Sequence, residues 1–156
     1  MKSKRLKTIC LRPHLLIAFL FLCPAAFSQD LNINQDINTI TVKGVTFNQV
    51  VSRLLSHGYA IKNLDNKNKT VHTSFSKCKS KTAVMNISLN VHVRDSVAII
   101  TGKMCYNLNN NQYASPDSAR TSVVKYTRGA AKEAFLEMDS FAKSFKSEMI
   151  YSKTYY

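Results

Sequence analysis

The fold is decided by residues 85–100, which read MNISLNVHVRDSVAII. Apolar and polar side chains alternate without error over residues 85–94, as in a strand with one dry face and one wet face. Asp95-Ser96 is typical of a turn. Pairing Val93 with Ala98 across this turn places the apolar side chains of the strands before and after it on the same face of the sheet. The segment therefore predicts a long hairpin at the centre of an antiparallel sheet.

Two amphipathic helices are predicted around this hairpin. The first begins after Thr46, an N-cap that forms a capping box with Gln49, and ends at Gly58. Its apolar stripe consists of Phe47, Val50, Val51, Leu54 and Leu55. The second runs from about Gly129 to about Ser147, with the stripe Ala131, Ala134, Phe135, Met138, Phe141, Ala142 and Phe145.

Three further strands are expected, at 39–43, 59–64 and 70–76. In the last of these, Val71, Thr73 and Phe75 are expected to face inward. Residues 107–118 are predicted to form a surface loop, while residues 123–126 fit either a strand or the first turns of the second helix. The fold class is α+β: an antiparallel sheet in the order β-α-β-β-β-β-α, with both helices packed on one face.

The N-terminus has the features of an export signal. Basic residues precede a short apolar run at 15–22 (LLIAFLFL), and small residues at 26 and 28 favour cleavage before Gln29. The run is shorter than the roughly 20 residues that span a bilayer, so we expect no transmembrane segment in the mature chain. The protein is then secreted or periplasmic, and lipid attachment at Cys23 is the minor alternative, because Leu22 stands where a small residue is needed.

The expected organisation has a single domain. It comprises a cleaved signal peptide at 1–28, a flexible lead-in at 29–37, an α+β domain at 38–150 and a tail at 151–156. Five of the 22 Lys and Arg residues lie in the signal, so 17 remain against nine acids and residues 29–156 carry a formal charge of +8. This charge predicts a weak attraction to anionic surfaces. Nucleic acid is not an expected partner, because the open sheet face shows no aromatic residue for stacking.

A resemblance adds to this reading of the architecture. Residues 50–61 (VVSRLLSHGYAI), a polar turn, residues 70–75 and a hairpin resemble small exported bacterial domains with the TBP-like or BamC-like helix-grip fold. The resemblance covers about residues 38–147. It implies an interaction module associated with the cell envelope, and it carries over no functional residue.

Two cysteines, Cys78 and Cys105, remain after processing. An isolated pair in an exported protein is typical of a disulfide, and the alternative is two free, partly buried thiols. We predict a bridge that holds residues 77–83 over the end of the central strand.

No catalytic motif is visible, and neither a cofactor nor a metal is expected: the sequence lacks a nucleophile elbow, paired carboxylates and a glycine-rich phosphate loop. The prediction is a non-enzymatic binding module of the envelope, with an unidentified protein or envelope component as partner. Its interaction surface would be either the loop at 107–118 or the wet sheet face, which is formed by His72, Ser74, Ser88, Asn90, His92 and Thr101. One alternative is a carrier of a small apolar ligand, held between the sheet and Phe135, Met138, Phe141 and Phe145. A small hydrolase or metal enzyme is the other.

Overall fold

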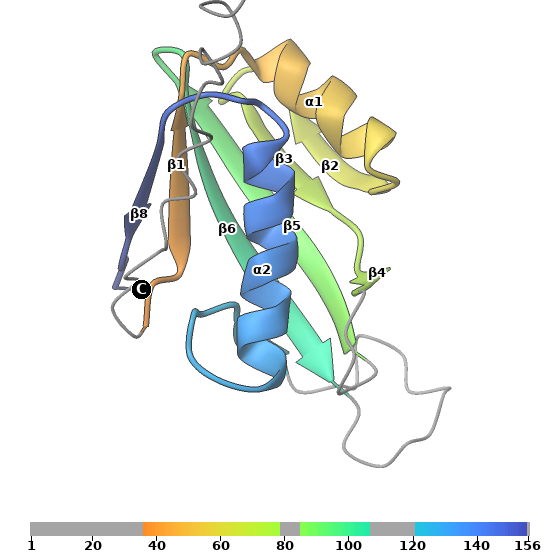
Figure 1. Cartoon of the computed structure of the whole chain (residues 1–156). Coiled ribbons are helices and arrows are strands. Elements are labelled where there is room, and N and C mark those ends of the chain that lie inside the picture. The colour runs from red at the N-terminus through yellow and green to blue at the C-terminus, as the bar shows by residue number, and fades with distance from the viewer. Residues whose placement is uncertain (1–35, 79–84, 107–120, 156) are drawn as a thin grey trace, which may run out of the picture. The chain divides into compact units, whose positions relative to one another are not determined.

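The computed structural model describes residues 36–78, 85–106 and 121–155 (Figure 1). Within these residues the elements are β1 (Thr39–Lys43), α1 (Phe47–Ser56), β2 (Ile61–Asp65), β3 (Thr70–Thr73), β4 (Ser76–Lys77), β5 (Met85–Arg94), β6 (Val97–Tyr106), β7 (Thr121–Val123), α2 (Ala130–Lys143) and β8 (Met149–Ser152). The eight described strands form one antiparallel sheet in the order β2-β3-β5-β6-β1-β8, with β4 paired to β5 and β7 paired to β6. The predicted α+β class is confirmed.

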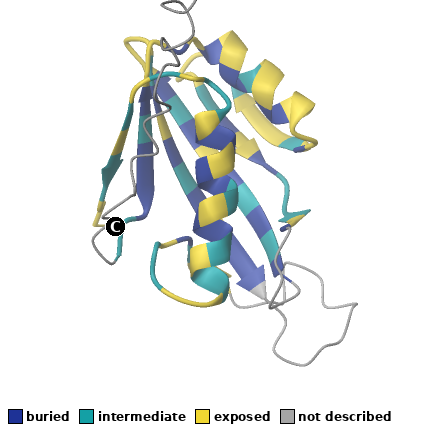
Figure 2. Cartoon of the chain, in the orientation of Figure 1, coloured by how far each residue is buried: buried dark blue, intermediate teal, exposed yellow. Residues whose placement is uncertain are grey.

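The β5–β6 hairpin has the predicted register. Val93 pairs with Ala98 and Val91 with Ile100, so the apolar side chains of both strands face the core. Asp95 and Ser96 have φ values of 50° and 59°, as the two central residues of a tight hairpin turn with the matching twist require. These two strands form the buried centre of the sheet (Figure 2).

Helix α1 has both of its predicted caps. The Thr46 side chain accepts the Gln49 N–H and the Gln49 side chain accepts the Thr46 N–H, which completes the capping box. At the other end Gly58, at φ 82°, donates to Leu55 O, and Tyr59 donates to Leu54 O at 3.0 Å. These are the two hydrogen bonds of a Schellman motif.

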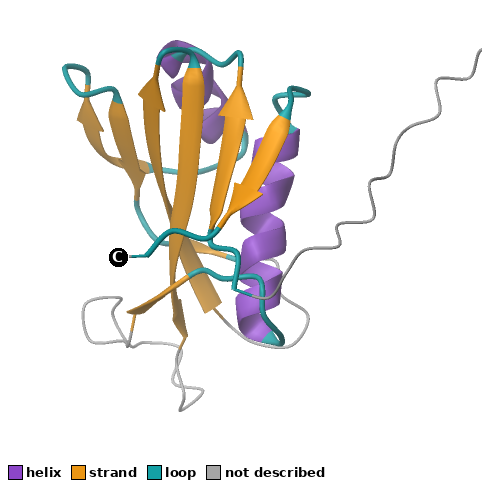
Figure 3. Cartoon of the chain, turned by 90° about the vertical axis from the view of Figure 1, so that its left-hand side faces the viewer, coloured by secondary structure: helices purple, strands orange, loops and turns teal. Residues whose placement is uncertain are grey.

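Helix α2 lies on the same face of the sheet as α1 (Figure 3). It ends at Lys143, one turn before the expected end, because residues 144–146 turn the chain toward β8. Phe135, Met138 and Phe141 of α2 are fully buried. Opposite them in β6 is Gly102, where an added Cβ would lie 3.0 Å from Val124 Cγ2 and 3.4 Å from Met138 Sδ. The helix and the sheet are therefore closely packed.

The predicted boundary at residue 150 falls inside β8, which pairs with β1 and brings the end of the chain into the domain. Asn38 and Thr154 exchange two hydrogen bonds of 2.8 Å. The Tyr151 hydroxyl donates to buried Asp139 at 2.7 Å, and Lys143 forms an ion pair with the same carboxylate. Burial and the hydrogen bond to Asp139 raise the pKa of Tyr151. These contacts fix β8 to α2.

The structure settles one stretch that the sequence left undecided, and several other predicted segments lie outside the residues that it describes. Residues 121–123 form β7 and Tyr126 bridges to Ile37, so the undecided stretch before α2 is extended rather than helical. The signal peptide, residues 29–35 of the lead-in and the predicted loop at 107–118 lie outside the described residues.

Candidate binding site on the open sheet face

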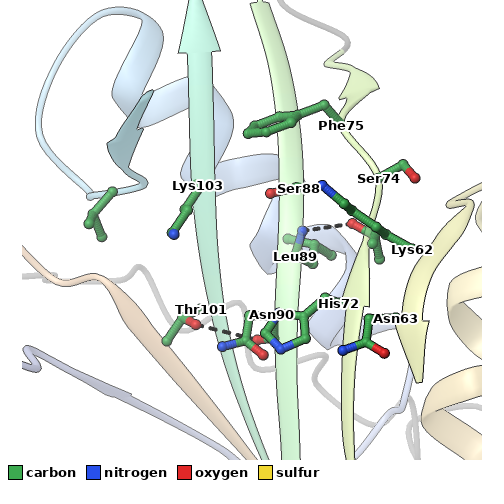
Figure 4. A pocket seen from close by; sticks show the side chains of 12 residues that line it. Lys62, Asn63, His72, Ser74, Phe75, Ser88, Leu89, Asn90, Thr101 and Lys103 are labelled. Carbon is green, nitrogen blue, oxygen red and sulfur yellow. Dashed lines mark hydrogen bonds between the residues drawn. The ribbon is translucent and has the colours of Figure 1, made fainter. Parts of the chain in front are cut away.

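The face of the sheet opposite the two helices contains a concavity of about 880 Å³. Five of the six predicted surface residues line it: His72, Ser74, Ser88, Asn90 and Thr101 (Figure 4). We call this hollow the open-face concavity; the described residues that line it are Lys62, Asn63, His72, Thr73, Ser74, Phe75, Ser88, Leu89, Asn90, Thr101, Lys103 and Val123. The sixth predicted residue, His92, lies outside this lining, and its Nδ1 is 3.0 Å from the Thr70 hydroxyl.

A β-bulge places Phe75 in this concavity. His72 pairs with Asn90 and Ser76 with Ile87, so three residues on the β3–β4 side oppose only two residues of β5. One extra residue reverses the alternation of faces and re-aims a side chain. The expectation that Phe75 faces inward is therefore wrong: the ring is half-buried and lies over the polar side of β5 (Figure 4).

The same bulge leaves Thr73 in the core. Its buried hydroxyl accepts the backbone N–H of Leu89 at 2.8 Å, so this donor is satisfied although the ladder is irregular. The floor of the open-face concavity is thus held by a side-chain hydrogen bond as well as by the strand pairing.

A second irregularity places Lys62 beside Phe75. On the edge strand, Ile61 pairs with Thr73 but Asn63 pairs with His72, which leaves Lys62 as the extra residue. Its side chain extends from β2 toward β5 and Ser88 (Figure 4). Two bulges on neighbouring strands therefore direct a cation and an aromatic ring into one hollow.

The electrostatics of the open-face concavity are positive. Lys62 and Lys103 are exposed cations on opposite sides of it, and none of the described residues that line it is acidic. The carboxylate of Asp65 in the β2–β3 turn accepts hydrogen bonds from Asn68 and Lys67, and these bonds lower the pKa of Asp65. That carboxylate is engaged within its own turn and remains anionic. The site consequently favours an anionic ligand.

The floor of the open-face concavity offers neutral hydrogen-bonding groups. Ser74, Ser88, Asn63, Asn90 and Thr101 present hydroxyls and amides, which both donate and accept hydrogen bonds. Thr101 donates to the Asn90 backbone carbonyl at 3.4 Å, a long bond across the β5–β6 pair. The arrangement can bind and orient a polar ligand.

The predicted disulfide between Cys78 and Cys105 is wrong: both thiols are free and buried. Cys78 lies beside Met85, whose carbonyl accepts its N–H, and belongs to the apolar core. Cys105 pairs with Asn86 on the other side of β5, and its position in the alternation places it on the opposite face. Two strand spacings, about 9–10 Å, and opposite faces separate the thiols, whereas a bridge needs Cα atoms within about 7 Å.

Burial and the nearby carboxylates of Glu137 and Glu133 raise the pKa of Cys78 to about 11. A thiol in this environment stays protonated near neutral pH and is a poor nucleophile.

Metal-ligating side chains are not brought together in the described part of the chain, where no group of three or more His, Cys, Asp or Glu could hold an ion. His57 caps α1 and contacts the Phe141 ring edge-on, with centroids 5.6 Å apart. Among the described residues, no helix has the length and apolar character that crossing a membrane requires.

The carrier hypothesis needs space between α2 and the sheet; at Gly102 of β6 the two are in contact, since an added Cβ would lie 3.4 Å from Met138 Sδ of α2. On the helical side there is a hollow of about 500 Å³ between α1 and the segment after α2. Gln49, Ser52, Arg53 and Ser147 contribute to its lining, so it does not resemble an apolar ligand cavity.

Comparison with known proteins assigns this chain to no family, because no family model and no curated protein matches its sequence. The class of protein must therefore be inferred from the fold and the open-face concavity.

Proposed function

We propose that this chain is an exported, non-enzymatic binding module that uses the open-face concavity as its contact surface. The observation that carries the proposal is the convergence of Lys62, Phe75 and Lys103 on a floor of neutral polar side chains. Two bulges are needed to assemble this group, whereas a merely solvated sheet face would need none.

The scaffold supports the same proposal. Side chains anchored on paired strands are held more rigidly than side chains on loops, and preorganised groups lose less entropy on binding. Both helices pack on the other face, so no described helix competes for the concavity. Export is supported by the sequence of residues 1–28, and the resemblance to envelope-associated helix-grip domains agrees with it.

Site-specific photocrosslinking tests the proposal. The full chain with its own leader is expressed in a bacterial host, and a photoreactive amino acid replaces Ser88 in the open-face concavity. The matched control replaces Ser52, which is exposed on α1 and lies outside that concavity. We expect envelope adducts from position 88 and not from position 52, together with an intact mass that begins at Gln29. Equal yields at the two positions, or none at position 88, would refute the proposed contact surface.

A further inference from the structure

We propose that the open-face concavity binds an acidic oligosaccharide, a short segment of a polysaccharide whose sugar rings carry carboxylates. This inference deepens the proposed function and rests on it. Three properties of the site carry it: the placement of its cations, the chemistry of its floor and the position of its single aromatic ring.

The cations lie far apart. Lys62 is on β2 and Lys103 on β6, with β3 and β5 between them. Three strand spacings correspond to about 14 Å between the two backbones. An extended ligand with several negative groups can contact both lysines at this spacing, whereas one small anion would reach both only if the two lysine side chains converged on it. The spacing favours an oligomer over a free phosphate or a single sugar acid.

The floor between the lysines is neutral and rich in hydrogen-bonding groups. Ser88, Asn90 and Thr101 project from β5 and β6, and both hydroxyl and amide groups can donate and accept. Sugar hydroxyls also donate and accept, so they match this floor more closely than the aliphatic side chains of a peptide do. Because the floor lies in the interior of the sheet, a peptide could not bind there by adding a strand, as it can at a sheet edge.

Phe75 supplies the apolar contact. Its half-buried ring lies over β5 beside the Lys62 side chain, where the flat C–H face of a sugar ring can stack on it (Figure 4). One aromatic ring is less than the series of stacking platforms used for single-stranded nucleic acid. A flat anionic membrane is also a poor fit, because it cannot reach the floor of a concave site.

Titration calorimetry with trigalacturonate as the probe and maltotriose as the uncharged probe of equal length tests the inference. We expect trigalacturonate to bind with an affinity that falls as salt is added, and maltotriose to bind at least about tenfold more weakly. The double variant Lys62→Gln/Lys103→Gln should lose about tenfold or more in affinity for trigalacturonate. Lys67→Gln is the matched control, because Lys67 is exposed in the neighbouring β2–β3 turn and does not line the concavity; its affinity should be unchanged.

The variant Phe75→Leu separates the contribution of ring stacking to the affinity for trigalacturonate from the contribution of charge. It retains an apolar side chain without a ring face, so the affinity should fall about threefold to tenfold while the salt dependence stays the same. An unchanged thermal transition would show that this variant is folded. Equal losses in Lys67→Gln and the double variant would overturn the inference, because they would show general charge attraction. Binding to anionic phospholipid vesicles as strong as binding to trigalacturonate would overturn it as well.

The two proposals fail in different ways. Crosslinking from position 88 without trigalacturonate binding would refute the acidic oligosaccharide and leave the binding module in place. Absence of both would refute the two together.

Discussion

Replacing Gly102 by alanine should destabilise the domain, although the backbone of this residue is extended and accepts alanine. The added Cβ would lie 3.0 Å from Val124 Cγ2, 3.2 Å from Val124 Cβ and 3.4 Å from Met138 Sδ. Comfortable carbon–carbon contacts are about 3.5–4.0 Å, so Val124 must move by about half an ångström. Val124 is fully buried, and its N–H donates to the Gly102 carbonyl at 2.9 Å, which restricts that movement.

Two effects of opposite sign decide how much Gly102→Ala changes the free energy of unfolding. Overpacking a buried site destabilises the fold by about 1–3 kcal/mol. Replacing glycine lowers the conformational entropy of the unfolded chain, which stabilises the fold by about 0.4–1 kcal/mol. We therefore expect Gly102→Ala to lower the free energy of unfolding by about 1–2 kcal/mol. Urea denaturation followed by circular dichroism measures this change, and the slope of the transition should not change.

A double-mutant cycle identifies the contact responsible. Val124→Ala removes the Cγ2 methyl, the atom nearest to the new Cβ, and leaves the Val124 Cβ in place, so Gly102→Ala should cost less in the Val124→Ala background, with a coupling of about 1 kcal/mol. A Gly102→Ala variant as stable as the parent protein would refute the reasoning. It would mean that Val124, in the segment before α2, is not tightly packed over Gly102.

Three further predictions concern the helix cap, the thiols and alkaline pH. Thr46→Ala should lower the free energy of unfolding by about 1 kcal/mol, while Thr46→Ser, which keeps the hydroxyl that caps α1, should stay within about 0.5 kcal/mol in the same urea assay. Iodoacetamide at neutral pH should label Cys78 and Cys105 only after unfolding, and labelling both without a reductant would exclude a disulfide. The pKa of Cys78 is raised from 9.0 to about 11 and that of Tyr151 is raised as well, so the native state keeps protons that the unfolded chain releases. Stability should accordingly be full below about pH 9 and decline toward about pH 11, and a Cys78→Ala variant with the same decline would contradict the contribution assigned to this thiol.

The elements predicted well from the sequence are those specified by neighbouring residues. The capping box at Thr46, the glycine stop at Gly58 and the β5–β6 register each depend on a few residues close together in the chain. Local hydrogen bonding and strict alternation leave few alternatives in such segments.

The missed features depend on pairing between distant segments. The bulge at Ser74-Phe75 exists only relative to β5, so no count of alternating residues along β3 could place Phe75 on the open face. The cysteine prediction did not recognise that Cys78 and Cys105 belong to opposite faces of the sheet. Lys62 was not part of the predicted surface because the edge bulge that directs it has no signal in the sequence. Lys103 was missed although alternation places it on the same face as Thr101, two residues earlier in β6.

The pairing of β1 with β8 determines when the sheet can be completed. Residues 38 and 154 are 116 positions apart, and β1 lies between β6 and β8. At roughly 5–20 residues per second, synthesis of the intervening chain takes about 6–23 s. Until then β1 can have at most one of its two neighbours, and Asp139 lacks the Tyr151 hydroxyl. The unfinished chain therefore keeps an unpaired strand edge. On the export route that we propose, this order of events would keep the chain unfolded enough for transport and would delay the final closure of the sheet until residues 149–154 have crossed the membrane.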